Sequence, residues 1–202
     1  QFMTNPDITA TFDVVKRGES FTANLTAFLN ENILNTLVAQ KADAKVTVKY
    51  RSLGKWQSSV QKLELTALSR NSMTWEDDRA AAAFISGRDA SASAFARQVR
   101  AIISDSINPS RPLNLQYGAA LYGALKAYGL NYVIDPSSAF TDNIGTASVD
   151  FLKFPYQTLL YRGGDCDDLT ILNCALFEAL GIDTAMITVP GHIFIAFDSG
   201  LT

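Results

Sequence analysis

The chain of 202 residues is poor in the residue types that bind metals and form cross-links. It has two cysteines, Cys166 and Cys174, and a single histidine, His192. One histidine excludes a histidine-rich metal site. Both cysteines fall on one predicted helix, and eight residues of helix span about 12 Å, which is too far for a disulfide. A chain without disulfides fits both the cytosol and the bacterial periplasm.

Long apolar runs and an excess of positive charge are also missing. No uninterrupted apolar segment approaches the roughly 18 residues that a transmembrane helix needs. The formal net charge is −3 and the pI about 5.1, so we expect no nucleic-acid partner and no binding to an anionic membrane. Because the chain begins with Gln1 and not with a start methionine, we expect it to be a piece of a longer protein.

The composition that is present, 48% hydrophobic and 18% charged, is that of a globular protein. Over the first seventy residues apolar and polar residues alternate with a period of two, which is typical of half-buried antiparallel strands. The alternation is clearest in residues 8–14, 21–29, 46–50 and 63–67. We expect four or five strands in a small β-sandwich-like domain over residues 1–72.

Helical spacing begins near Trp75. Asp89 is a plausible N-cap and Gly129 a plausible helix stop. A long irregular stretch follows at residues 131–148, which is either a functional loop or a surface connection. Three helices are predicted in this part of the chain: residues 75–85, 89–103 and 113–130. The expected apolar stripe of the second is Phe95, Val99 and Ile102, and that of the third is Leu115, Leu121 and Leu125.

The segment "RGGDCDDLTILNCALFEALGI", residues 162–182, predicts a further helix. Asp165 is its expected N-cap, with Asp168 as the acid of a capping box, and Gly181 its expected end. Two strands, "IDTAMITV" and "HIFIAF", follow around a Pro-Gly turn, and His192 begins the second. The expected buried stripe of the helix is Leu169, Leu172, Leu176 and Leu180.

Cys166 falls on the first turn of this helix, where free N–H groups and the helix dipole favour a thiolate and can stabilise an oxyanion. The neighbouring aspartates oppose thiolate formation, and a nearby imidazolium would favour it. From the residues alone two interpretations stay open. Cys166 is a nucleophile or a small buried hydrophobe, and His192 is its base or a hydrogen-bonded structural histidine. Cys174 is expected in the core.

Residues 154–198, "FPYQTLLYRGGDCDDLTILNCALFEALGIDTAMITVPGHIFIAFD", resemble the core of the transglutaminase-like superfamily, in its bacterial cysteine-protease type. In that family the nucleophile follows Gly-Asp at the start of a central helix, and a histidine lies on a strand that packs against it. Cys166 and His192 match these two positions. The resemblance implies an α+β fold over residues 73–202: a papain-like core with an antiparallel sheet, cut short at its C-terminus.

The resemblance also implies a Cys–His–Asp triad. Asp198 is the only acid soon after His192, but six residues of one strand would separate them by about 20 Å. We therefore expect the third triad residue to lie beyond Thr202. The alternatives are that it is missing, or that an acid from residues 131–150 replaces it.

Two weaker site candidates also come from the resemblance. Gln157 is an oxyanion donor by analogy with papain-like enzymes, or else a solvent-facing amide. Some bacterial relatives bind calcium through carboxylates that flank the nucleophile, and Asp165 and Asp167 stand in comparable places. Helix capping explains these acids without calcium, so we expect no cofactor and keep calcium as a weak candidate.

Two functions follow from these expectations. The first is a thiol-dependent acyl-transfer enzyme acting on peptide or glutamine amides of a protein or peptide substrate, more by hydrolysis than by cross-linking. The second is a catalytically inactive transglutaminase-like scaffold that binds proteins. The location is open, and the bacterial periplasm or cell surface is a guess from the N-terminal β-domain and the many small polar residues.

Overall fold

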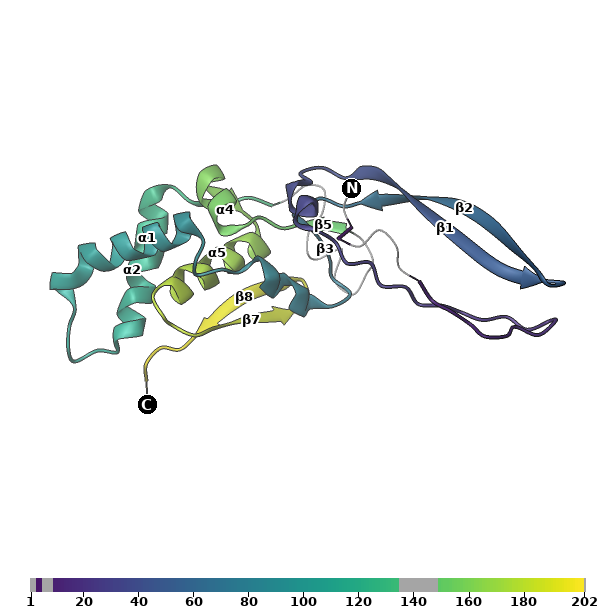
Figure 1. The fold of residues 1–202 in the computed structure, drawn as a ribbon. Helices are drawn as coiled ribbons and strands as arrows, with labels where there is room; N and C mark the ends of the chain where they lie inside the picture. The colour runs from purple at the N-terminus through teal and green to yellow at the C-terminus, as the bar shows by residue number, and fades with distance from the viewer. Residues whose placement is uncertain (1–2, 5–8, 135–148, 202) are drawn as a thin grey trace. The chain divides into compact units, whose positions relative to one another are not determined.

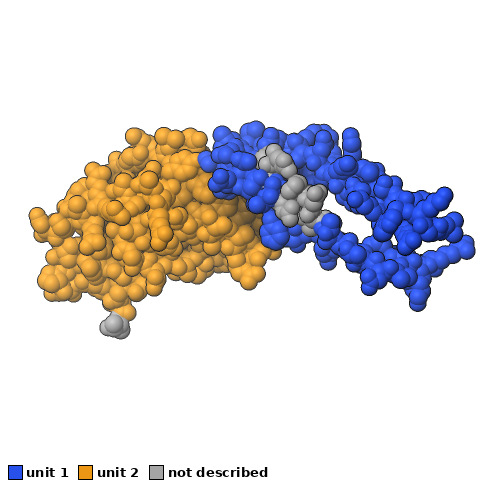
Figure 2. Space-filling view, viewed as in Figure 1, with its two compact units in different colours: residues 1–70 blue, residues 71–202 orange. Residues whose placement is uncertain are grey.

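The computed structural model describes residues 3–4, 9–134 and 149–201 (Figure 1). The chain divides into two compact units, residues 1–70 and 71–202, coloured blue and orange in Figure 2. Helices and small, mostly antiparallel sheets make the fold mixed α+β, which confirms the expected class at that level.

The first unit contains one long two-stranded ribbon. Strands β1 (Gln40–Ser52) and β2 (Lys55–Ala67) pair antiparallel along their whole length. Leu53 and Gly54 join them with positive φ angles of 48° and 79°. Two successive positive φ angles match the right-handed twist of paired strands, so this short loop fixes the register of the ribbon.

No second sheet covers the ribbon within the described part of this unit. The alternation places apolar side chains on one face, but they stay exposed; Val48, for example, is 49% exposed. Among residues 3–4 and 9–70 only Thr36 and Ser69 are buried, and neither is apolar. The predicted β-sandwich-like domain is therefore wrong for these residues.

Residues 9–28 form neither helix nor strand, although their alternation predicts strands. The only further elements here are the short helix η1 (Glu31–Asn35) and an isolated bridge between Met3 and Leu29, within the described residues. Alternation identifies a chain that suits a half-buried face. Alternation does not show whether a neighbouring strand is present to form the hydrogen-bonded ladder. Strands were therefore wrongly predicted in residues 9–28.

Helices form most of the second unit. Asp89 caps α1 as predicted, because its carboxylate accepts hydrogen bonds from the N–H groups of Ser91 and Ala92, each at 3.0 Å. Gly129, with φ of 86°, ends α2 as predicted. No described helix has the length and apolarity needed to cross a membrane. The helices are η2 (Asp78–Phe84), α1 (Ala90–Ile103), η3 (Ser104–Ser106), α2 (Leu113–Tyr128), α4 (Pro155–Tyr161) and α5 (Cys166–Ala179).

Three two-stranded sheets accompany these helices. The last of them, a hairpin around the Pro190-Gly191 turn, confirms the two strands predicted after the cysteine helix. The other two join segments that are distant in the sequence. The pairs are β3 (Ser72–Thr74) with β5 (Val149–Phe151), β4 (Asn131–Tyr132) with β6 (Gly163–Gly164), and β7 (Thr184–Val189) with β8 (His192–Phe197).

Helix α5 is central to the second unit, since ten of its fourteen residues are buried. Its middle and end join the larger apolar cluster with α1 and α2, for example through Leu172 and Leu176. Its start joins a smaller cluster that includes Cys166, Ile171 and Ile193. Of the predicted stripe, Leu172 and Leu176 are buried and Leu169 and Leu180 are half-buried. The buried surface is also wider than one stripe, because a central helix is covered on several sides.

Two other predicted stripes need correction. On α1 the stripe was expected to include Ile102, which is 72% exposed; Ala92, Ala96 and Val99 are the buried positions. On α2 Leu115 was expected inside but is 46% exposed. Small alanines, and not the largest side chains, lie where α1 packs against its neighbours, because they permit close approach.

Candidate active site

The first turn of α5 is held by a close backbone contact just before it. Strand β6 pairs with β4 in parallel, which places Tyr132 opposite Gly164, and the N–H of Val133 donates to the carbonyl of Gly164 at 2.9 Å. A Cβ on Gly164 would lie 2.5 Å from the Cβ of Asp168. Glycine is therefore required here, and the Gly-Asp-Cys sequence has a packing reason.

Cys166 lies on this turn, 8% exposed, with two hydrogen-bond donors at its sulfur. They are the backbone N–H of Ile193 on β8 and the hydroxyl of Tyr132 on β4. Burial and the charge of Asp167 raise the pKa of the Cys166 thiol, while the two donors act in the opposite direction. The thiol thus has partners for a developing negative charge, but in this conformation it is held mainly as the neutral form.

His192 begins β8 directly before Ile193, and its side chain is exposed. Because the side chain of Ile193 packs with Cys166, strand alternation turns His192 to the opposite face of the hairpin. There its ring lies against that of Phe194, with centroids 6.1 Å apart. The fold brings the backbone beside His192 to the sulfur but not the imidazole, so the Cys–His pair stays a prediction.

Three buried aspartates surround the start of α5. Carboxylate oxygens of Asp165, Asp167 and Asp168 lie within 4.8 Å of one another. Asp167 hydrogen-bonds to Asp165 and also accepts from the N–H of Asp168 at 2.6 Å. Burial, this bond to Asp165 and the neighbouring negative charges raise the pKa of Asp167 to about 10. Asp167 is therefore neutral at pH 7, and its charge opposes ionisation of the Cys166 thiol only once this proton is lost.

The third acid of the cluster forms an ion pair. The carboxylate of Asp168 accepts hydrogen bonds from the backbone N–H of Lys153 at 2.7 Å and from its ammonium group. Burial raises the pKa of Asp168, and the bonds to Lys153 oppose that rise. Lys153 thus supplies the positive charge that compensates a carboxylate only 1% exposed.

A fourth buried acid lies nearby. Asp150 accepts a hydrogen bond from the indole Nε1 of Trp75 at 2.6 Å and one from the N–H of Phe151 at 2.7 Å. Residues 131–150 were expected to offer a replacement for the third triad residue, and Asp150 is the acid of this stretch that the structure describes. Its side chain binds Trp75. The other two acids of that stretch, Asp135 and Asp142, lie outside the described residues.

The structure corrects the expectation for Gln157. Its amide is buried, not solvent-facing, and its Oε1 accepts from Nδ2 of Asn71 at 2.7 Å and from the N–H of Phe154 at 2.9 Å. The second bond satisfies a free N–H at the start of α4. Gln157 therefore has a structural role at that helix start.

Asp198 lies where strand geometry predicts. The N–H of Asp198 donates to the carbonyl of Asp183 at 3.0 Å, which continues the β7–β8 ladder without a break. Its carboxylate accepts from the N–H of Gly200 at 2.9 Å. An unbroken strand keeps Asp198 about 20 Å from His192 along the chain, so it cannot orient that imidazole.

The predicted capping box is also wrong. Asp165 is the N-cap residue of α5, but its side chain makes no capping hydrogen bond. Asp168, the expected reciprocal partner, binds Lys153 instead. The capping pattern in the sequence could not show this, because the lysine lies in a different segment that folds across the helix start.

The weak calcium candidate at Asp165 and Asp167 stays an expectation, and Asp168 lies beside them. Oδ1 of Asp165 is buried without a hydrogen-bond partner, but Asp167 keeps a proton at neutral pH and Lys153 occupies Asp168. Calcium takes six to eight oxygen ligands. A cation here would need Asp167 to lose its proton and would need further ligands beyond these three acids.

Sequence reasoning missed Tyr132 and Lys153. Tyr132 reaches the thiol through a two-residue strand that pairs with another two-residue strand, which is too short to give a periodic signal. Lys153 is the one charged residue in the apolar run "FLKFP", and that isolated charge was the available signal. A lysine in such a run needs an acid partner when it is packed inside.

The chain was compared with protein-family models, with curated proteins and with solved structures, and no match was found in any of the three. The likeness to the transglutaminase-like superfamily therefore rests on the motif residues around Cys166 and His192.

Proposed function

We propose that the protein is a thiol-dependent acyl-transfer enzyme that hydrolyses amides of a peptide or protein, with Cys166 as nucleophile. The observation that supports this is the pair of donors at the sulfur, the N–H of Ile193 and the hydroxyl of Tyr132, on the first turn of a buried helix. Donors in such positions stabilise negative charge during attack on a carbonyl. The core cysteine Cys174 also has a hydroxyl donor, Thr184, but it has no backbone donor from another element among the described residues.

In the proposed reaction the thiol proton passes to His192, and the sulfur attacks the amide carbonyl carbon. The carbon–nitrogen bond then breaks, the amine leaves with the proton, and water hydrolyses the thioester. Proton transfer requires hydrogen-bond distance. Side-chain rotation cannot carry the imidazole of His192 through the hairpin, so in the reactive conformation the backbone at the start of β8 must differ from the one described here.

The second candidate is a transglutaminase-like scaffold without catalysis. Two observations favour it: burial raises the pKa of Cys166, and His192 lies on the opposite face of β8. In this case the donors at the sulfur only satisfy a buried thiol, and Cys166 has the same chemical role as Cys174.

Thiol alkylation distinguishes the two functions. Iodoacetamide is added at pH 7, and peptide mass spectrometry measures the labelling rates of Cys166 and Cys174 separately. For the enzyme we expect Cys166 to react at least tenfold faster than a free cysteine, because a thiolate is the reacting species. Cys174, fully buried and with a pKa of about 11, is the internal control and should stay unlabelled.

His192→Ala tests the base. In the enzyme this variant should slow labelling of Cys166 to the rate of an ordinary buried thiol without lowering the melting temperature, because the imidazole is exposed. Equal and slow labelling of Cys166 in parent and variant would contradict the proposed enzyme and support the scaffold.

A further inference from the structure

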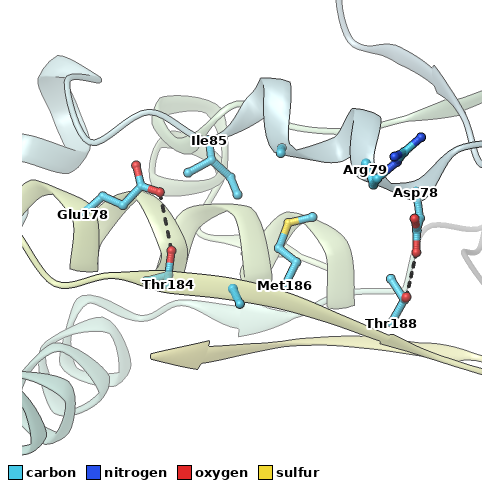
Figure 3. Close-up of a pocket in the computed structure, with 9 residues that line it drawn as sticks. Asp78, Arg79, Ile85, Glu178, Thr184, Met186 and Thr188 are labelled. Atoms are coloured by element: carbon cyan, nitrogen blue, oxygen red, sulfur yellow. Dashed lines mark hydrogen bonds between the residues drawn. The ribbon is translucent and has the colours of Figure 1, made fainter. Parts of the chain in front are cut away.

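A cavity of about 360 Å³ lies beside strand β7, and Cys166 does not line it. Figure 3 shows Thr184, Met186 and Thr188 projecting from β7 towards η2 and the end of α5. Ala185, which points to the other face of the strand, also lines the cavity. Contact with residues from both faces means that the cavity runs along the edge of β7.

The backbone along this edge is unpaired. In an antiparallel pair, residues alternate between those that bond across the ladder and those whose N–H and C=O point outward. Asp198 donates across the ladder to Asp183, so the alternation turns the backbone groups of Thr184, Met186 and Thr188 outward, away from β8. Within the described residues, no second strand pairs with this edge of β7.

The same alternation accounts for the opposite edge of the hairpin. Ile193 on β8 also points its backbone outward, and there it has partners. Its carbonyl accepts from the hydroxyl of Thr170 at 3.3 Å, and its N–H donates to the sulfur of Cys166. One edge of the hairpin is therefore covered by α5, and the other faces the cavity.

Acidic side chains lie at both ends of the cavity, with apolar ones between them. Asp78 accepts a hydrogen bond from Thr188 at 2.7 Å, and Glu178 accepts one from Thr184 at 3.5 Å, as Figure 3 shows. Each carboxylate keeps oxygens for a further donor. Among the described residues that line the cavity, Arg79 is the only cation, and it binds Asp77 through two hydrogen bonds of 2.8 Å. Ile85 and Met186 form the apolar middle.

We infer that this edge is a docking site for an extended peptide segment that adds to β7 as a third strand. Its alternate side chains are basic, apolar and basic. They lie opposite Thr184, Met186 and Thr188, so the basic groups reach Glu178 and Asp78. The spacing follows from the strand, because alternate residues share a face. Main-chain hydrogen bonds give affinity in this binding mode, and the side-chain contacts give specificity.

Fluorescence anisotropy with a labelled acetyl-Ser-Lys-Thr-Leu-Thr-Lys-Ser-amide peptide tests the proposal. We expect saturable binding at low salt that weakens at high salt, and no binding of the peptide with glutamate in place of both lysines. Two further peptides carry backbone N-methyl groups. In one they are on both lysines and the leucine, and in the other they are on both threonines. Strand addition uses only one alternate set of amides. One methylated peptide should therefore lose at least tenfold in affinity, and the other should bind as before.

The protein variants Asp78→Asn and Glu178→Gln should each weaken binding about three- to fivefold at low salt, and less at high salt. The amide side chains of both variants keep an oxygen that accepts the hydrogen bond from Thr188 or Thr184, so the fold should be unaffected. Thermal unfolding of each variant checks this. Cys166→Ala should bind the peptide unchanged, which separates the docking site from the proposed catalysis.

Three results would each overturn the proposal. The first is equal binding of the acidic and basic peptides. The second is equal affinity of both methylated peptides. The third is protection of the amides of Thr184, Met186 and Thr188 from hydrogen exchange before any peptide is added, because the edge would then already be covered.

Discussion

The first turn of α5 and its later turns are both buried, but different interactions stabilise them. The later turns bury Leu172, Cys174 and Leu176 among apolar neighbours from α1 and α2. The first turn buries three carboxyl groups and a thiol. Burial of apolar groups stabilises the fold directly. Buried acids cost free energy unless each is neutralised or paired, and this turn uses both means.

The two cysteines show this difference in one residue type. Burial raises the pKa of both thiols, to about 11 for Cys174. Each sulfur has a hydroxyl donor, Tyr132 for Cys166 and Thr184 for Cys174, and within the described residues only Cys166 has a backbone donor from another element as well. Position on the helix, and not burial, therefore separates a site candidate from a core residue.

The largest expected effect comes from removal of the cation at the first turn. Lys153→Met keeps the length of the side chain but leaves Asp168 buried without a charge partner. We expect the free energy of unfolding at pH 7 to fall by about 3 to 5 kcal/mol. Urea unfolding measures the loss. Most of the loss should disappear at acidic pH, where Asp168 becomes protonated and no longer needs the cation.

Leu172→Ala is the matched change at the later turns. Leu172 is fully buried, so we expect a loss of about 2 to 5 kcal/mol. This loss should be independent of pH, since no charge is involved. A pH-dependent loss in Leu172→Ala, or a pH-independent loss in Lys153→Met, would contradict the assignment of the two turns to different kinds of stabilisation.

A smaller effect is expected for Asp167→Asn. The pKa of Asp167 rises from 3.8 to about 10 on folding, so the folded state keeps a proton that the unfolded state loses. Its contribution to stability is complete below pH 4 and declines as the pH rises towards 10. Asparagine has an oxygen for the N–H of Asp168 and an amide donor for Asp165, so it imitates the protonated acid.

Urea unfolding as a function of pH tests this prediction. Asp167→Asn should be more stable than the parent by about 1 kcal/mol or more at pH 8, and equal to it near pH 4. Asp167→Ala, which lacks both hydrogen bonds, should be less stable at both pH values. A parent whose stability rises between pH 4 and pH 8 just as that of the asparagine variant does would contradict the raised pKa of Asp167.

The sequence predicted the local structure of the second unit well, because its signals are local. Asp89 caps a helix with its own side chain, Gly129 permits a positive φ, and Pro190-Gly191 closes a hairpin. Each of these depends on residues within four positions. The structure of the first unit was predicted poorly. An alternating sequence shows that a strand would have an apolar face, but it does not show which strand pairs with it or what covers that face.

The candidate site was predicted only in part for the same reason. Cys166 was placed correctly at a helix start by its Gly-Asp context. The groups that determine its chemistry come from elsewhere: Tyr132, Lys153 and the backbone of Ile193. The face of β8 that carries His192 depends on which residues α5 covers, and a period of two cannot decide between two apolar-rich faces.

The smallest expected effect concerns the donor from β4. Tyr132→Phe removes one hydrogen bond to the sulfur and leaves the N–H of Ile193 in place. The hydroxyl lowers the pKa of Cys166, so without it the pKa should rise further. The pH dependence of iodoacetamide labelling at Cys166 measures this shift. Tyr122→Phe, on the exposed face of α2, is the control and should change nothing. An unchanged profile in Tyr132→Phe would mean that only the helix start and the backbone of β8 act on the sulfur.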